Sequence, residues 1–339
     1  MRRLRWFLAW LALFYGAWLT YVVAAGAWAS LAAHWPIALA MAAGSYVAGS
    51  TPMGGGTVGF PILVLMLGES AKLGRDFAFA IQSIGMTSAS IYILCTRRPL
   101  ERRMLGWAMA GSLLATPPAV AFLAPRVDEI AVKMLFAVVW MSFGLMHFVK
   151  LREICAATGI TRMSAGFDRA AGFAAGALGG ALIASVTGVG VDMLVYAVLV
   201  LLARADLKIA IPTSVVIMAF TSVVGIATQA LLSHASPHTW SLAPGLFDHW
   251  LAAAPVVALG APLGAFVVAR VGRKPTLFVV SILCAAQFVW MVWHERDQLG
   301  AAGVGLSLAG VLLFNAVFHL LYAAGGRLAR RRGHQAAAA

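Results

Sequence analysis

The chain has 339 residues, of which 62% are hydrophobic and 11% charged, and its mean hydropathy is +0.89. Water-soluble globular proteins do not have this composition, and several apolar runs long enough to cross a bilayer indicate a polytopic membrane protein. The net charge is +13, with 25 Lys and Arg against 12 Asp and Glu. Most basic residues stand in short loops and tails, which is typical of topology signals and of contact with anionic lipids. Attraction of an anionic substrate is a second interpretation.

The chain begins with a basic segment, residues 1–5, followed by an apolar run over 6–28. That run is too long for the core of a signal peptide and long enough to span a membrane. We therefore predict an uncleaved helix whose N-terminus faces the cytoplasm.

The next apolar run, 36–67, is interrupted at 51–61 by four glycines and two prolines. Such a segment cannot be a regular helix, and in lipid an irregular backbone is tolerated only inside protein or along a cavity. We predict a broken helix that ends near Ser50 and restarts near Pro61, with unpaired N–H groups that could bind an anion in mid-membrane. The anion-binding residues predicted here are Gly54, Gly55, Gly56 and Thr57.

A second glycine-rich segment, 176–191, is again followed by an apolar run, 193–202. Two interrupted segments at matching places in two halves indicate a transporter binding site. Asp192 opens the second half-helix, where a charge is costly and usually functional. One interpretation is a partner of the helix dipole, and the other is a proton-coupling carboxylate that is neutralised when an anion binds. The anion-binding residues predicted here are Thr187, Gly188 and Gly190.

The placement of Lys and Arg decides between two topologies. If both broken segments crossed the membrane fully, the basic loops 97–103 and 150–169 would lie on opposite sides, against the positive-inside rule. If each segment dips to mid-membrane and returns, both loops and both termini lie in the cytoplasm. We therefore predict two re-entrant hairpins.

The predicted fold is an all-α polytopic membrane protein with two inverted repeats. Each repeat is a broken re-entrant hairpin plus three membrane-spanning helices, and one extra helix stands at each end. Displacing the first half by 131 positions pairs Gly49 with Gly180 and Gln82 with Thr213; chance similarity of glycine-rich segments is the alternative. The expected spans are 6–28, 76–95, 104–124, 130–149, 207–232, 250–269, 276–294 and 302–323. The expected divisions are 1–36 for the added N-terminal helix, 37–150 for repeat one, 151–169 for a cytoplasmic linker, 170–295 for repeat two, and 296–339 for the added C-terminal helix and its basic tail at 327–332.

The sequence contains none of the common enzyme motifs, such as HExxH, GxSxG or a P-loop, so we predict no enzymatic activity. The 3 cysteines show no CxxC spacing, and we predict neither a metal site nor a cofactor.

The remaining candidates for binding residues are small polar side chains within the predicted membrane segments. The pairs Gln82-Ser83 and Thr213-Ser214 follow the two broken segments, and we predict that they donate hydrogen bonds to a small oxyanion beside the glycine N–H groups. The alternative is ordinary bonding between helices or to the preceding turn. Arg75 and Asp76 are expected at the outer mouth, as a surface ion pair or as an attractor of anions.

Gly54-Gly55-Gly56 with Pro61, followed by Gln82-Ser83, resembles the TauE/SafE sulfite exporter family, as does the echo Thr187-Gly-Val-Gly190 with Pro212-Thr213-Ser214. The resemblance covers roughly residues 37–295. The second motif lacks the family's triple glycine and following proline, and Asp192 stands where that proline is expected. The resemblance implies a secondary carrier in the bacterial inner membrane that moves sulfite or small organosulfur anions such as sulfoacetate.

The leading hypothesis is therefore a secondary transporter of small sulfur-containing anions. Export is favoured, because an inside-negative potential drives an anion outward by about 2.3 kcal/mol per charge per 100 mV. The alternatives are a membrane scaffold or partner protein without transport, and an anion channel. The expected partners are the anion and membrane lipids, with no nucleic acid. The sequence leaves open the identity of the anion, the direction, the coupling ion and the oligomeric state.

Overall fold

The structure, a computed structural model, describes residues 2–161, 164–268, 270 and 273–337, without the side chains of 2, 273 and 329–337. Parts of the predicted loops 150–169 and 270–274, and most side chains of the predicted basic tail, therefore lie outside the described residues. The described residues form helices and connecting turns, with no strand among them.

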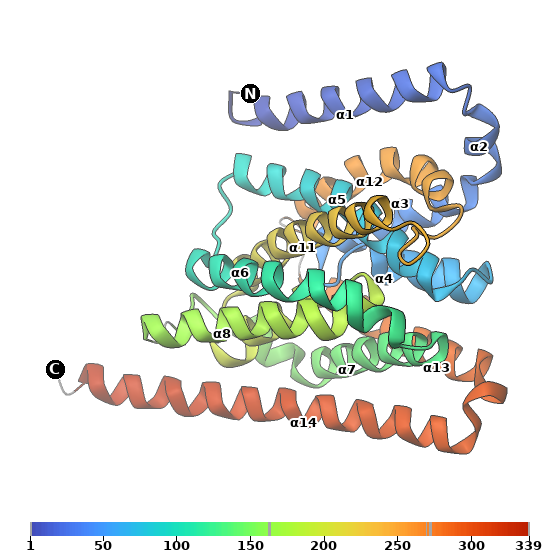
Figure 1. Cartoon of the computed structure of the whole chain (residues 1–339). Coiled ribbons are helices and arrows are strands. Elements are labelled where there is room, and N and C mark those ends of the chain that lie inside the picture. Colours follow the sequence, from blue (N-terminus) through green and yellow to red (C-terminus); the bar gives the residue numbers. More distant parts are fainter. Residues whose placement is uncertain (1, 162–163, 269, 271–272, 338–339) are drawn as a thin grey trace.

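Nine helices in the described part of the chain are long and apolar enough to cross a membrane. The long helices run roughly parallel in Figure 1, with α1 along one side of the bundle and α14 along the other. The prediction of an all-α polytopic membrane protein is confirmed. The nine spans lie in α1 (Arg5–Ala24), α5 (Ala71–Cys95), α6 (Arg102–Pro118) with its continuation to Arg126, α7 (Glu129–Ala156), α8 (Ala165–Leu178) with its continuation to Thr187, α11 (Leu207–Ala235), α12 (Leu246–Val268), α13 (Arg273–His294) and α14 (Arg296–Ala337).

Several helices begin or end away from their predicted positions, and N-terminal caps explain two of the starts. The Ser70 hydroxyl accepts from the Leu73 N–H group (3.2 Å), so α5 starts at residue 71 rather than 76. Asp128 accepts from the Ala131 N–H group (2.7 Å) and starts α7 at residue 129. The predicted helix 6–28 ends at 24 and is followed by the short helix α2 (Trp28–Ala33).

The first broken segment is a hairpin with both ends at one end of the bundle, which we call the Arg75 end. It consists of α3 (Trp35–Ser50) and α4 (Gly56–Pro61), which continues as a wider helical turn to Met66. The His34 ring, before α3, lies 4.6 Å from the His249 ring, between centroids. Lys72, after the hairpin, donates to Ser241 in the loop that leads to α12, which carries His249 (3.0 Å). The predicted break after Ser50 is confirmed, whereas the predicted restart near Pro61 is wrong, because α4 begins at Gly56 and Pro61 lies within the helical segment 56–66.

The second broken segment is also a hairpin, and its ends lie at the opposite end of the bundle, the Arg98 end. Its first arm is α8, continued by a wider turn and α9 (Ser185–Thr187), and its second arm is α10 (Val191–Ala197), continued to Leu202. The Thr161 N–H group donates to the Ala203 carbonyl (2.8 Å), which ties the two ends together. The first arm has 23 residues, long enough by itself to cross a bilayer, so it is longer than a dip to mid-membrane requires.

The halves share one element order, a broken hairpin followed by three long helices. The first arm of each hairpin packs against a helix of the other half, an arrangement that we call exchanged packing. The arm α3 packs along α12 of the other half, and α8 packs along α6. Glycines allow this close approach, because a Cβ at Gly49 would overlap the Ala261 carbonyl and one at Gly176 the Ala108 carbonyl. The inverted relation of the halves and the domain divisions stay predictions, and the exchanged packing supports them.

The two basic loops that decided the topology lie at the same end. Arg103 forms an ion pair with Asp168 (3.5 Å), and the Glu101 N–H group donates to the Thr213 hydroxyl (3.0 Å). Helix α1 begins, and α14 ends, at this end of the bundle (Figure 1, left). This arrangement matches the re-entrant topology, whereas the assignment of this end to the cytoplasm stays a prediction.

Candidate anion-binding site at the helix breaks

The two breaks meet at the side chain of Gln82, on α5. Gln82 Nε2 donates to the Gly188 carbonyl of the second break (3.2 Å) and to the Ala78 carbonyl of its own helix (2.9 Å). On the other side, a Cβ added to Gly54 of the first break would overlap Gln82 Oε1 and would lie 3.2 Å from Asp192 Oδ2. Segments far apart in the sequence are thus joined around one buried amide.

The backbone of the first break presents unpaired donors. Gly54 has a left-handed φ of +67°, and Gly55 follows in the right-handed region with φ −72°. Alternation of this kind turns successive N–H groups toward one concavity, an arrangement that binds anions. The next helix, 56–66, has no acidic residue in its first turn. None of the N–H groups of residues 54–57 has a hydrogen-bond partner among the described residues.

The second break differs, because the N–H groups of Gly188, Val189 and Met193 already have partners. Gly188 and Gly190 have φ values of +79° and +108°. The Val189 N–H group donates to the Thr187 hydroxyl (3.4 Å), and the Met193 N–H group donates to Asp192 Oδ1 (3.0 Å). The Asp192 carboxyl group therefore already accepts a hydrogen bond from the start of its own half-helix. The predicted binding role of Thr187, Gly188 and Gly190 stays a prediction.

Two unpaired acceptors complete the site. Gln82 Oε1 and Asp192 Oδ2 are buried and have no hydrogen-bond partner among the described residues. Both lie beside Gly54, next to the free N–H groups. Leaving such an acceptor unpaired costs about 1–3 kcal/mol. The site therefore requires a hydrogen-bond donor, which a protonated Asp192 or a ligand that carries a hydroxyl group would supply.

The Thr57 side chain supports the break rather than facing a ligand. Its hydroxyl donates to the Met53 carbonyl and accepts from Trp140 Nε1 of α7 (2.8 Å). Gln287 of α13 donates to the Thr57 carbonyl (2.9 Å). Sequence reasoning missed Trp140 and Gln287, although a buried indole or amide N–H group in an apolar helix needs an acceptor, and this requirement could have identified them.

Three predicted donors are not brought to the contacts around Gln82. The Ser83 hydroxyl bonds to the Ala80 carbonyl (2.8 Å), and Ser83 lines an apolar cavity of about 410 Å³ on another side of α5. Thr213 and Ser214 bond to carbonyls of the preceding turn (2.7 and 2.8 Å). Bonding to the preceding turn, the alternative considered from the sequence, is the state of all three hydroxyls. Their role toward an anion stays a prediction that requires these bonds to open.

The space at the first break is small in this conformation. The hollow beside Gly55 and Gln82 has a volume of about 10 Å³. About 10–15 Å³ is needed for a single water, so sulfite does not fit. An anion reaches these N–H groups only if the helices around the breaks separate.

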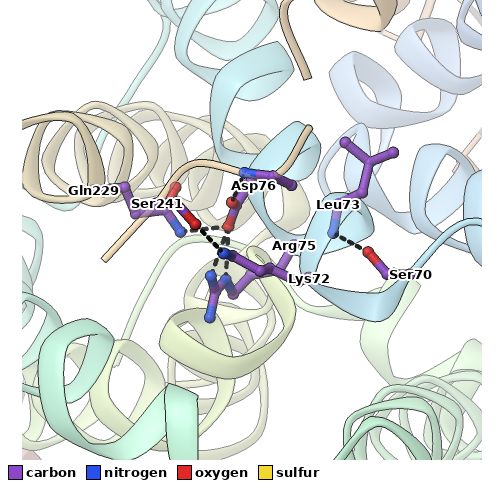
Figure 2. Close-up of polar contacts among 8 residues, drawn as sticks. Ser70, Lys72, Leu73, Arg75, Asp76, Gln229 and Ser241 are labelled. Carbon is purple, nitrogen blue, oxygen red and sulfur yellow. Dashed lines mark hydrogen bonds and ion pairs between the residues drawn. The ribbon is translucent and has the colours of Figure 1, made fainter. Parts of the chain in front are cut away.

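A wider cavity of about 320 Å³ opens at the Arg75 end and reaches Val186, just before the second break. Figure 2 shows its polar wall. Arg75 pairs with Asp76 (2.7 Å), which also accepts from Gln229 Nε2 (2.7 Å) and from the Ala243 N–H group (3.0 Å). Asp76 is only 1% exposed, so the expectation of a surface ion pair is wrong. The Asp76 carboxylate instead ties α5, α11 and the loop before α12 together.

The described residues contain no group of three or more His, Cys, Asp and Glu that could hold a metal ion.

A family model described as sulfite exporter TauE/SafE matches residues 36–291, which include both breaks, Gln82 and Asp192. No curated protein and no solved structure matches the chain. Helix α1 and all of α14 lie outside the match.

Proposed function

Because the chain belongs to the TauE/SafE sulfite exporter family, we propose that it is a secondary transporter of small sulfur-containing anions, sulfite or organosulfonates such as sulfoacetate, in the bacterial inner membrane. One observation carries the proposal. The unpaired N–H groups of residues 54–57 lie buried beside Gln82, where the two breaks meet. A bundle that needed the breaks only for packing would leave no row of buried donors unpaired.

In this proposal the anion binds the first break. The N–H groups of residues 54–57 and the positive end of helix 56–66 stabilise its charge without a buried lysine or arginine. Binding therefore stays weak enough for release. The Gln82 amide links the anion site to the second break, because its Nε2 group donates a hydrogen bond to the Gly188 carbonyl.

Asp192 couples the anion to a proton in this proposal. At about 4 Å and an effective dielectric constant of about 20, two like charges repel by about 4 kcal/mol. A carboxylate beside Gly54 therefore excludes the anion unless it is protonated. Protonated Asp192 would also donate to Gln82 Oε1 or to the ligand, which satisfies the unpaired acceptors. Asp192 shares α10 with Tyr196, whose hydroxyl is hydrogen-bonded to His147 Nε2 (2.9 Å).

We assign the Arg98 end to the cytoplasm, because the loops 97–103 and 150–169 lie there. Both termini are then cytoplasmic. The exchanged hairpin arms fit two inverted repeats, 37–150 and 170–295, with the linker 151–169 between them and the added segments 1–36 and 296–339 at the ends.

The direction of transport depends on coupling. The inside-negative membrane potential would drive an anion that moves alone outward. A proton carried together with a monoanion cancels its charge, so the concentration gradients of the anion and the proton then set the direction.

The test is flux and binding with the purified protein. In proteoliposomes we expect saturable uptake of radiolabelled sulfite or sulfoacetate, and we expect sulfite to raise the thermal unfolding midpoint where chloride does not. A scaffold would show neither effect, and a channel would show flux that does not saturate. Ser83→Ala and Ser214→Ala test the predicted hydroxyl donors, since unchanged affinity and rate in both variants would exclude that role.

A further inference from the structure

Each end of the bundle has a hollow that leads toward a break, and the two hollows differ in size. The cavity at the Arg75 end has a volume of about 320 Å³, and the hollow at the Arg98 end has about 30 Å³. The first reaches Val186 on the arm before the second break. The second reaches Gly49 on the arm before the first break.

The walls of the two hollows come from corresponding elements of the two halves. The Arg75 cavity lies between the start of α5, the end of α11 and the segment that continues α6. The Arg98 hollow lies between the start of α11, the end of α5 and the end of α12. Exchanging the halves converts these three walls of one hollow into those of the other, and the start of α7 lines the Arg75 cavity in addition. The residues that line the Arg98 hollow are Gly49, Ile93, Arg98, Leu207, Lys208, Ile211, Pro212, Ala265 and Val268.

Each hollow also carries two basic side chains, Lys72 and Arg75 at one end and Arg98 and Lys208 at the other. The first two are engaged, Lys72 with Ser241 and Arg75 with Asp76 (Figure 2). The side chains of Arg98 and Lys208 have no hydrogen-bond or ion-pair partner among the described residues. No acidic residue lines their hollow, so their charges are available to an anion.

We infer that the Arg98 hollow is the closed counterpart of the Arg75 cavity, and that Arg98 and Lys208 form a capture site for the small anion when this end opens. The inference rests on the proposed transport function and adds a site to it. In the conformation described, the Arg75 end is open, the Arg98 end is closed and the breaks between them are packed shut. Closing one hollow and opening its counterpart around a fixed central site is the movement expected of a carrier built from two repeats.

The test compares transport from the two ends. Membrane vesicles of both orientations present radiolabelled sulfite either to the Arg98 end or to the Arg75 end. In the double variant Arg98→Gln, Lys208→Gln, we expect the KM for sulfite presented at the Arg98 end to rise about tenfold, because two attracting charges are lost. The KM from the Arg75 end stays unchanged, and Lys72→Gln shows the opposite pattern. Arg102→Gln, an exposed arginine at the Arg98 end that does not line the hollow, is the charge-matched control and leaves both KM values unchanged.

A KM that rises equally from both ends, or from neither, overturns the inference while transport itself is intact. If the parent protein carries no sulfite or sulfonate, the proposed function fails instead. A change in the thermal unfolding midpoint identifies a variant that is misfolded.

Thiol labelling provides a second measurement that does not depend on charge. Ile211, which is 4% exposed, lines the Arg98 hollow. In a protein whose three cysteines are replaced by serine, Ile211→Cys is expected to react with a membrane-impermeant maleimide only from the Arg98 end. Its rate is expected to change when sulfoacetate is added, which, unlike sulfite, does not itself react with a maleimide. A residue that stays unreactive under all transport conditions contradicts an opening of this hollow.

Discussion

The first break is tested most sharply by adding one methyl group to either of two glycines with the same backbone conformation. Gly54 has φ +67° and Gly68 has φ +72°. A Cβ at Gly54 meets Gln82 and Asp192, whereas a Cβ at Gly68 meets nothing within 4 Å. Gly54→Ala and Gly68→Ala therefore share the strain of the left-handed region and differ in the contacts at the site.

The expected magnitudes follow from these contacts. The left-handed conformation costs an alanine about 1–2 kcal/mol, so Gly68→Ala loses that amount of unfolding free energy. Gly54→Ala also displaces the Gln82 amide and breaks its hydrogen bond to Gly188, worth about 1 kcal/mol, for a total of about 2–3 kcal/mol. The larger difference is expected in binding, because the new methyl group stands beside the N–H groups of residues 54–57.

The assay is the thermal unfolding midpoint with and without sulfite. At a sulfite concentration of 100 Kd, the parent protein and Gly68→Ala are expected to gain about 2.7 kcal/mol, and Gly54→Ala is expected to gain almost nothing. Flux in proteoliposomes is expected to follow the same order. Equal sulfite-dependent stabilisation of the two variants would refute the assignment of the anion to the first break.

Three further changes test the parts of the site. Gln82→Leu removes the bond to Gly188 and also an unpaired buried oxygen, so the unfolding midpoint is expected to stay nearly unchanged while flux is lost; a variant with full flux would contradict the role of the amide. Asp192→Asn keeps an acceptor for the Met193 N–H group but removes the charge. Calorimetry is therefore expected to show that binding of an alkylsulfonate weakens with rising pH in the parent protein and not in the variant. Binding that is independent of pH in both proteins would argue against coupling. Trp140→Phe leaves the Thr57 hydroxyl without its donor and is expected to lower the unfolding free energy by about 1 kcal/mol in a denaturant titration, and no loss would show that this bond does not hold the break.

The sequence was sufficient to predict the broken helices and the hairpins. Four glycines and two prolines in 51–61 exclude a regular helix, and the basic loops 97–103 and 150–169 require both hairpins to return to the side from which they started. The sequence also placed Gln82 beside the breaks, although it could not show that Gln82 bonds to Gly188, because nothing local indicates which distant carbonyl faces a buried amide.

The predicted hydroxyl donors illustrate what the sequence pattern missed. Gln82 and Ser83 are consecutive on a helix, and consecutive residues point about 100° apart, so they cannot both face the breaks. Asp192 was recognised as unusual, but its proximity to Gly54 depends on how the hairpins meet. The wider helical turns that continue α4 and α10 were also not predicted, because such turns follow from packing rather than from a local motif.

The central claim is that the anion binds the N–H groups of the first break, in contact with Gln82 and next to Asp192. An experimental structure of the protein in lipid with selenite, a heavier analogue of sulfite, tests it most directly. The account predicts selenium density within hydrogen-bonding reach of the N–H groups of residues 54–57, with the helices around the break moved apart. Density only beside Lys72 and Arg75 in the wide cavity, with the break still closed at saturating selenite, would contradict it.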